Sequence, residues 1–262
     1  MNSKPVIKSE SAMRILISEF SIIVLLCLLT LSSGLTAETA GPFLKALKAQ
    51  DLEQLAILIK NGAKIDQSLS NGKTALMVAS RAGRSDLIAR FIQAGADVNV
   101  SNQNGGTALM YSAIQGDAGG LRLLLASGAQ VNHIGNNGWT AIVLAAIKNH
   151  QQAVAVLLEY GANPNQQDIY GWSALMRAAN LNRSAGIASL LKAVNINLDL
   201  RDDSGATALH HGAEKNHLKV VEQLLAAGAD PNVLDNQGRT AARRAQLSGY
   251  SSLAQLIREH RS

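Results

Sequence analysis

The chain has 262 residues, a formal net charge of +5 and only 3% aromatic residues. Its basic residues are scattered singly and lack the clustered stripe of a nucleic-acid surface, so we expect no nucleic-acid partner. The single cysteine, Cys27, lies near the N-terminus. The rest of the chain therefore offers neither a thiol nucleophile nor a cysteine-based zinc site.

The first 37 residues have the pattern of an export signal. Basic residues precede an almost wholly apolar run, Ser21–Leu31, and small residues follow it. These features predict a secretory signal peptide over residues 1–37, cleaved after Ala37. The alternative is an uncleaved membrane anchor over residues 15–35, which are long enough to span a bilayer although Glu19 interrupts them.

Localisation follows from this segment. A short signal in front of a cysteine-free mature chain suggests a bacterial protein that relies on packing rather than on disulfides. We therefore expect a periplasmic or secreted protein, or one anchored in the inner membrane if the signal is not removed.

After residue 38 the chain is dominated by an internal repeat. A motif of Gly, any residue, Thr or Ser, and Ala recurs six times, with the hydroxyl residue at Thr74, Thr107, Thr140, Ser173, Thr207 and Thr240. The spacing is 33 residues at every step except for 34 between Ser173 and Thr207. A period in this range indicates a stack of small similar units rather than one globular core.

Each unit is predicted to contain two short helices, as the copy over residues 136–168 illustrates. Thr140 suits the N-cap of an Ala-rich first helix, because its hydroxyl can accept from the free N–H groups of the first turn. A second helix, roughly Gln151–Tyr160, has apolar residues at helical spacing on one side, and Gly161 ends it. We interpret the 34-residue step as a one-residue loop insertion within residues 192–199.

The repeated residues resemble the ankyrin repeat. The Thr-Ala-Leu motif, a small Ala pair, a Leu pair and the Gly-Ala-Asp-Val-Asn of Gly95–Asn99 match that family in about seven units over residues 41–262. The resemblance implies an all-α solenoid of stacked helix-turn-helix units with hairpin-like loops. The histidine of the family signature stands only at His210, so the threonine hydroxyls of the other units lack that hydrogen-bonding partner.

We expect one ankyrin-repeat domain over residues 38–262, because a solenoid grows by adding repeats. Its units are predicted over residues 42–69, 70–102, 103–135, 136–168, 169–202, 203–235 and 236–262. The first and last units are interpreted as caps, since a stack needs polar outer faces at its ends. The last unit carries Arg243 and Arg244 where other units are mostly apolar.

One cluster of side chains has the composition of a metal or catalytic site. His210, Glu214 and His217 would share a helix face if one helix ran through all three. The repeat explains two of them, because His210 occupies the signature position and His217 matches His150 at a turn. No nucleophile–base pair or phosphate loop stands at a characteristic spacing. We therefore predict no enzyme, metal or cofactor, and a metal-dependent enzyme using this cluster is the alternative.

The positions that vary between units predict the binding surface, since in ankyrin-like proteins such positions line the concave face of loops and first helices. Large side chains should cluster there in the middle units: Trp139, Trp172, Tyr170, Ile169, Ile147, Lys148, Ile114 and Leu181. Tryptophan and tyrosine are enriched in interface hot spots, and exposed apolar patches mark interaction sites. We therefore predict a noncatalytic module that binds a protein partner, with no small-molecule substrate.

The alternative to a binding role is that each tryptophan folds over the preceding loop and only seals that loop. Lys73, Arg81 and Arg239 flank the central units, and their charges would suit a mildly acidic partner.

Overall fold

The computed structural model describes residues 41–260, so the predicted signal or anchor over residues 1–37 lies outside the described part. The described chain begins with a helix over residues 41–49. The following helices are α2 (Leu52–Lys60), α3 (Ala75–Arg81), α4 (Ser85–Gln93), α5 (Ala108–Gln115), α6 (Ala118–Ala126), α7 (Ala141–Ile147), α8 (Gln151–Glu159), α9 (Ala174–Asn180), α10 (Ser184–Leu190), α11 (Ala208–Glu214), α12 (Leu218–Ala226), α13 (Ala241–Leu247) and α14 (Ser251–Glu259). Within residues 41–260 we find no helix long and apolar enough to cross a membrane.

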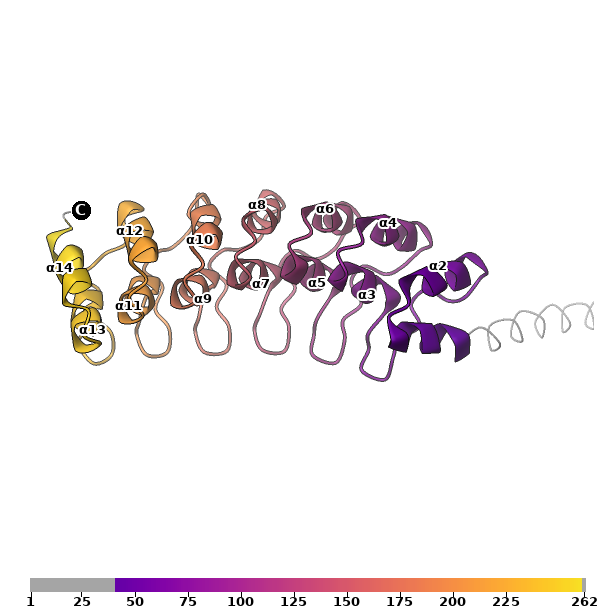
Figure 1. Cartoon of the computed structure of the whole chain (residues 1–262), viewed down its shortest axis with the longest axis horizontal. Helices are drawn as coiled ribbons and strands as arrows, with labels where there is room; N and C mark the ends of the chain where they lie inside the picture. The colour runs from indigo at the N-terminus through magenta and orange to yellow at the C-terminus, as the bar shows by residue number, and fades with distance from the viewer. Residues whose placement is uncertain (1–40, 261–262) are drawn as a thin grey trace, which may run out of the picture.

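From α3 onward the helices form two layers in one elongated stack (Figure 1). The odd-numbered helices α3 to α13 pack side by side in an inner layer, and the even-numbered helices pack behind them in an outer layer. Hairpin-like loops project from the inner layer, along the lower edge of the stack in Figure 1. The predicted all-α solenoid of helix-turn-helix units is confirmed.

Side-chain size explains why the two layers pack closely. The inner helices are rich in alanine, and Ala145 and Ala146 of α7 are completely buried, which lets neighbouring helices approach. The outer helices turn one apolar stripe inward, with Val154 and Leu157 of α8 also fully buried. Each unit therefore adds its own hydrophobic layer to a continuous core.

Five of the inner helices show how well a hydroxyl caps the first turn. The side-chain oxygen accepts from the N–H three residues on at 3.2 Å in Thr240, 3.3 Å in Ser173, and 3.4 Å in both Thr74 and Thr107. The buried Thr140 hydroxyl makes no hydrogen bond within residues 41–260. Thr140 is the N-cap residue, as predicted, but its predicted capping hydrogen bond is absent.

Consecutive loops approach each other so closely that one position needs glycine. Gly138 has φ +81°, and a Cβ built on it would lie 2.7 Å from Cα of Asp168 in the next loop. Side-chain amides strengthen the same contact between other loops, since Asn136 donates to the Gln103 carbonyl at 2.7 Å. Gly138 therefore serves the stacking of loops.

The unit with the extra residue has a shorter second helix. α10 spans seven residues, whereas α8 and α12 span nine. Residues 192–199 contain no helix, and Val194 is fully exposed there. The longer spacing is thus absorbed in a surface loop, where an added residue disturbs no packing.

Candidate partner-binding surface

Two tryptophans, an arginine and a histidine stack on one another across three consecutive units. The Arg177 guanidinium carbon lies 4.6 Å from the ring centroid of Trp172 and 5.8 Å from that of Trp139. The Trp172 ring also stacks on His211, with centroids 4.0 Å apart and planes at 30°. We call Trp139, Arg177, Trp172 and His211 the aromatic stack. Each tryptophan directly precedes the N-cap of an inner helix, whereas Arg177 and His211 lie on α9 and α11.

A buried carboxylate fixes the loop that carries this stack. Asp168 is fully buried, and its Oδ1 accepts from the backbone N–H groups of Tyr170 at 2.9 Å and Trp172 at 3.0 Å. Its Oδ2 accepts from the Arg177 guanidinium, with Nε at 2.9 Å and Nη2 closer still. The same side chain therefore shapes the turn and holds the arginine between the two indoles.

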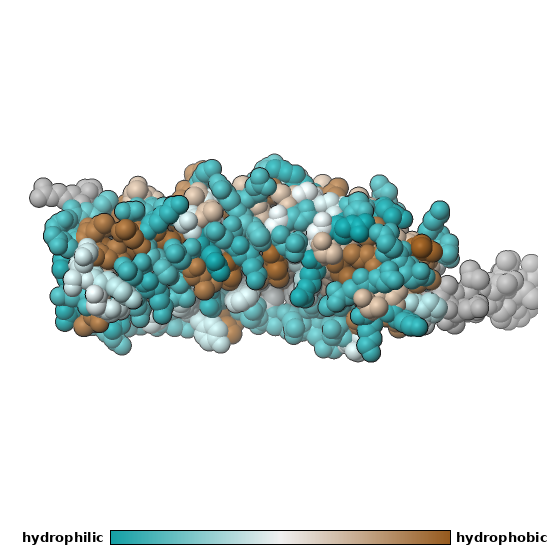
Figure 2. Space-filling model, viewed as in Figure 1, coloured by the Kyte–Doolittle hydropathy of each residue, from teal (hydrophilic) through white to brown (hydrophobic). Residues whose placement is uncertain are grey.

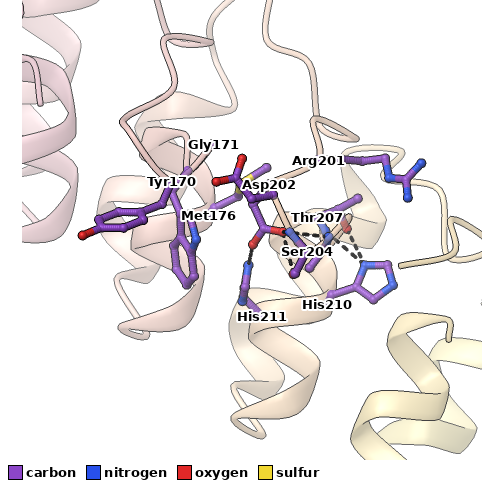
Figure 3. A network of polar contacts seen from close by, with 12 residues as sticks. Tyr170, Gly171, Met176, Arg201, Asp202, Ser204, Thr207, His210 and His211 are labelled. Atoms are coloured by element: carbon purple, nitrogen blue, oxygen red, sulfur yellow. Dashed lines mark hydrogen bonds and ion pairs between the residues drawn. The ribbon is translucent and has the colours of Figure 1, made fainter. Parts of the chain in front are cut away.

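The next unit repeats this arrangement with a histidine (Figure 3). Asp202 Oδ1 accepts from the N–H groups of Ser204 and Ala206, both at 2.9 Å, and from the Ser204 hydroxyl at 2.6 Å. Its Oδ2 accepts from His211 Nε2 at 2.8 Å. Burial lowers the pKa of His211, outweighing the attraction of Asp202, so the imidazole donates this hydrogen bond in its neutral form.

The charge of Asp202 is set by competing effects. Burial opposes its ionisation, but the hydrogen bonds from Ser204, Ala206 and His211 outweigh burial and lower the pKa of the carboxyl. Asp202 is therefore a carboxylate at neutral pH, and the neutral imidazole beside it does not cancel its charge.

The last loop uses the same device. Asp235 accepts from Arg239 Nε at 2.8 Å and from Arg244 Nε at 2.7 Å, and Arg244 also contacts Glu214 at 3.1 Å. Burial opposes ionisation of Asp235, but the two guanidinium groups hold the pKa of its carboxyl far below its ordinary value. Sequence reasoning missed these pairs, although their signal is present: an aspartate five residues before the N-cap and an arginine or histidine nine residues after the aspartate.

The predicted binding residues fall into two rows rather than one cluster. Trp139, Trp172, Tyr170 and Ile169 lie at the loop end of the inner helices, whereas Ile114, Ile147, Lys148 and Leu181 lie at the opposite end, about 10 Å away along seven residues of helix. Ile114 and Ile147 pack against the core. We call Trp139, Trp172, Tyr170 and Ile169 the loop row, and both tryptophans of the aromatic stack belong to it. The binding role of the two rows stays a prediction.

Exposure distinguishes the members of the loop row. Tyr170 and Ile169 are 59% and 61% exposed, whereas both tryptophans are half-buried and pack against the core. The tryptophans therefore stabilise their loops, and they also leave part of each ring at the surface. Figure 2 shows the side of the stack seen in Figure 1, where separate hydrophobic patches interrupt a mostly hydrophilic surface.

The candidate metal cluster does not come together. α11 ends at Glu214, and His217 is the N-cap of α12, so no single helix carries all three side chains. His210 pairs with the Thr207 hydroxyl at 2.9 Å and the Arg239 carbonyl at 3.0 Å, Glu214 pairs with Arg244, and His217 contacts the Asn180 carbonyl. No group of three His, Cys, Asp or Glu side chains within residues 41–260 has the arrangement of a metal site.

Comparisons with known proteins agree with this architecture. The family model "Ankyrin repeats (3 copies)" matches residues 43–134, 76–168, 121–202 and 175–262. The crystal structure of the human ASB11 ankyrin repeat domain superposes with a TM-score of 0.72, covering 82% of this chain and 97% of that domain. The two sequences are 23% identical, so this likeness shows the fold.

Similar stretches also occur in curated proteins. Calmodulin-binding transcription activator 5 of Arabidopsis thaliana is 43% identical over 76 residues, which make up 27% of this chain and 8% of that protein. The putative E3 ubiquitin-protein ligase XBAT34 of the same plant is 38% identical over 66 residues, 25% of this chain and 18% of that protein. The espin-like protein of Homo sapiens is 38% identical over 60 residues, 23% of this chain and 6% of that protein.

This chain thus spans less than a fifth of the length of each of these relatives. The matches to the family model together extend over residues 43–262. The structure shows the solenoid of stacked repeats that this family model implies. The chain therefore belongs to the ankyrin repeat family, whose repeats generally serve as noncatalytic protein-interaction modules.

Proposed function

We propose that this chain is an exported, noncatalytic module that binds a protein partner at the loop row, which comprises Ile169, Tyr170, Trp172 and Trp139. The observation that carries this proposal is the exposure of Ile169 and Tyr170 directly beside the aromatic stack. Tyrosine offers a large contact area with little side-chain freedom to lose on binding. The Asp168 hydrogen bonds hold this loop in place before any partner arrives, which lowers the entropic cost of association.

Site-specific photo-crosslinking in cells tests the binding surface. A photo-reactive phenylalanine derivative replaces Tyr170 in the full chain, and a matched chain carries it at Ile57, which is 51% exposed on the outer helix α2. We expect a discrete crosslinked protein from position 170 that is absent from position 57. The same product from both positions, or no product from position 170, would contradict the proposal.

The proposed route of export rests on the apolar run before residue 38. N-terminal sequencing of the purified protein separates cleavage from anchoring. We expect the mature chain to begin at Glu38 and to be released from cells by osmotic shock. An intact N-terminus in the membrane fraction would reject the cleaved signal in favour of the inner-membrane anchor.

A further inference from the structure

A surface pocket of about 420 Å³ opens between the loop of one unit and the loop and inner helix of the next. It is lined by Tyr170, Trp172, Arg177, Asp202, Asp203, Ser204 and His211. Figure 3 shows Tyr170 on one side of the Asp202 network and His211 below it. We call this depression the loop pocket.

Arg177 is the only cation that lines the loop pocket, and it is already paired within the chain. Arg177 pairs with the buried Asp168 carboxylate and lies over the Trp139 and Trp172 rings, so its charge and its planar faces are used within the chain. His211 is neutral, because burial lowers the pKa of its imidazole. Arg201 lies on the other side of the network from Tyr170 in Figure 3, where it contacts the Gly205 carbonyl and Asn236.

The carboxylates around the loop pocket therefore outnumber the cations. Asp202 and Asp203 line it, while the charge of Arg177 is balanced by Asp168. The Asp203 side chain is exposed and makes no hydrogen bond or ion pair within residues 41–260. The pocket thus carries a local negative charge, and one of its carboxylates remains available to a ligand.

Backbone contacts hold the loop of Asp203 against the loop of Tyr170. The Asp203 N–H donates to the Tyr170 carbonyl at 3.4 Å, which ties the two loops together. A Cβ built on Gly171 would lie 2.9 Å from Asp203 Oδ1, so the carboxylate lies directly over the backbone next to Tyr170. The Asp203 carboxylate and the exposed Tyr170 therefore line the same pocket from adjacent loops.

This pairing fits one side chain better than others. An arginine guanidinium is planar, stacks on aromatic rings and donates two parallel hydrogen bonds to a carboxylate. A lysine ammonium would satisfy the charge but would not stack in the same way. An acidic side chain would meet two carboxylates and no free cation.

We propose that the loop pocket receives an arginine side chain of the protein partner, which stacks on Tyr170 and pairs with Asp203. This inference rests on the proposed function and specifies the chemistry of the partner. It predicts a basic group on the partner, in place of the mildly acidic partner expected from the flanking cations. One of those cations, Arg239, is itself paired with Asp235 at 2.8 Å.

The test uses the purified full chain and N-acetyl-arginine amide as the probe, followed by two-dimensional NMR. We expect saturable shifts of the Tyr170 and Asp203 amides and of the Trp172 indole N–H. N-acetyl-glutamine amide, which is neutral, should leave these signals unchanged. Asp203→Asn should weaken the arginine response about fivefold, the effect of losing one exposed ion pair.

A matched variant separates the pocket from general electrostatics. Glu222→Gln removes the same charge from an exposed position on α12, and it should leave the arginine response unchanged. The inference is overturned if arginine shifts none of these signals or if Glu222→Gln weakens the response as much as Asp203→Asn. An equal response to N-acetyl-lysine amide would also overturn it, because the pocket would then recognise charge alone. A crosslink at position 170 without any arginine response would support the proposed function and reject the arginine side chain as the group that enters the loop pocket.

Discussion

The buried Asp168 carboxylate and the Arg177 guanidinium, nine residues apart, join the loop of one repeat to its first helix. The same carboxylate accepts two backbone hydrogen bonds from the loop that presents Tyr170 and Trp172. The stability of the repeat and the shape of its candidate binding surface therefore depend on one side chain.

Replacing this carboxylate should destabilise the stack. Asp168→Ala leaves the Arg177 charge and two loop N–H groups without their partner, and removing one member of a buried pair costs about 3 kcal/mol. Urea unfolding followed by circular dichroism measures this loss. Asp203→Ala is the matched control: this exposed neighbour should change stability by less than about 0.5 kcal/mol. Equal stability of the two variants would contradict a structural role for Asp168.

The stability cost of the close loop contact at Gly138 can be measured separately from the cost of its left-handed backbone. Gly138 and Gly161 have φ angles of +81° and +82°, but a Cβ would clash with Asp168 only at Gly138 and would meet open space at Gly161. Gly161→Ala should therefore cost about 1 kcal/mol for the left-handed backbone alone, and Gly138→Ala clearly more. Urea midpoints of the two variants give the comparison. Equal losses would mean that loop stacking does not require glycine.

His210 should stabilise its unit through hydrogen bonds that the other units lack. Its imidazole pairs with the Thr207 hydroxyl at 2.9 Å and with the Arg239 carbonyl of the next unit at 3.0 Å. His210→Met installs the residue found at the equivalent Met77, Met110 and Met176, and it should lower stability by about 1–2 kcal/mol. Met176→Leu serves as a core control with no hydrogen bond to lose from its side chain to a neighbouring unit. An unchanged midpoint for His210→Met would rule out the role assigned to this histidine.

Stability should fall when the solution is acidified below about pH 6.5. Burial lowers the pKa of His211 from its ordinary value of 6.5, so the unfolded chain takes up the proton more readily than the folded chain. The contribution of His211 is therefore complete above pH 6.5 and is lost as the pH falls. Asp202, whose pKa is also lowered, adds a further loss at more acidic pH.

Urea midpoints at pH 7.5 and pH 5.5 test this pH dependence. His211→Gln keeps a hydrogen-bond donor for Asp202 but does not titrate, so the variant should lose less stability than the wild type between the two conditions. The buried His210, whose pKa is also lowered by burial, remains in both proteins and supplies the residual change. An identical pH dependence in both proteins would contradict the assignment to His211.

The sequence was sufficient for the fold because its signals repeat. Thr140 and Gly161 mark the same helix start and stop as their counterparts in other units, so each prediction could be checked against several copies. The loop insertion near Val194 was visible for the same reason. The missing Thr140 hydrogen bond was not, since Thr140 occupies the same position of the motif as Thr74 and Thr107, which do make the bond.

The candidate site was less predictable, because its contacts cross from unit to unit. The spacing of Asp168 and Arg177 recurs in the next two units, but the contact of Arg177 with both tryptophans depends on the spacing of the inner helices. The varying positions at both ends of those helices looked equivalent in the sequence. Helix length separates them in space, which divides the predicted patch.

Affinity for the crosslinked protein is the most direct test of the binding surface. The full chain, its Tyr170→Ala variant and a matched Ile134→Ala variant, altered at a residue 49% exposed in the preceding loop, are titrated with that protein by calorimetry. Loss of a tyrosine hot spot should weaken binding by tenfold or more, about 1.4 kcal/mol, while Ile134→Ala should bind as the wild type does. Wild-type affinity in Tyr170→Ala would contradict a binding surface at the aromatic stack.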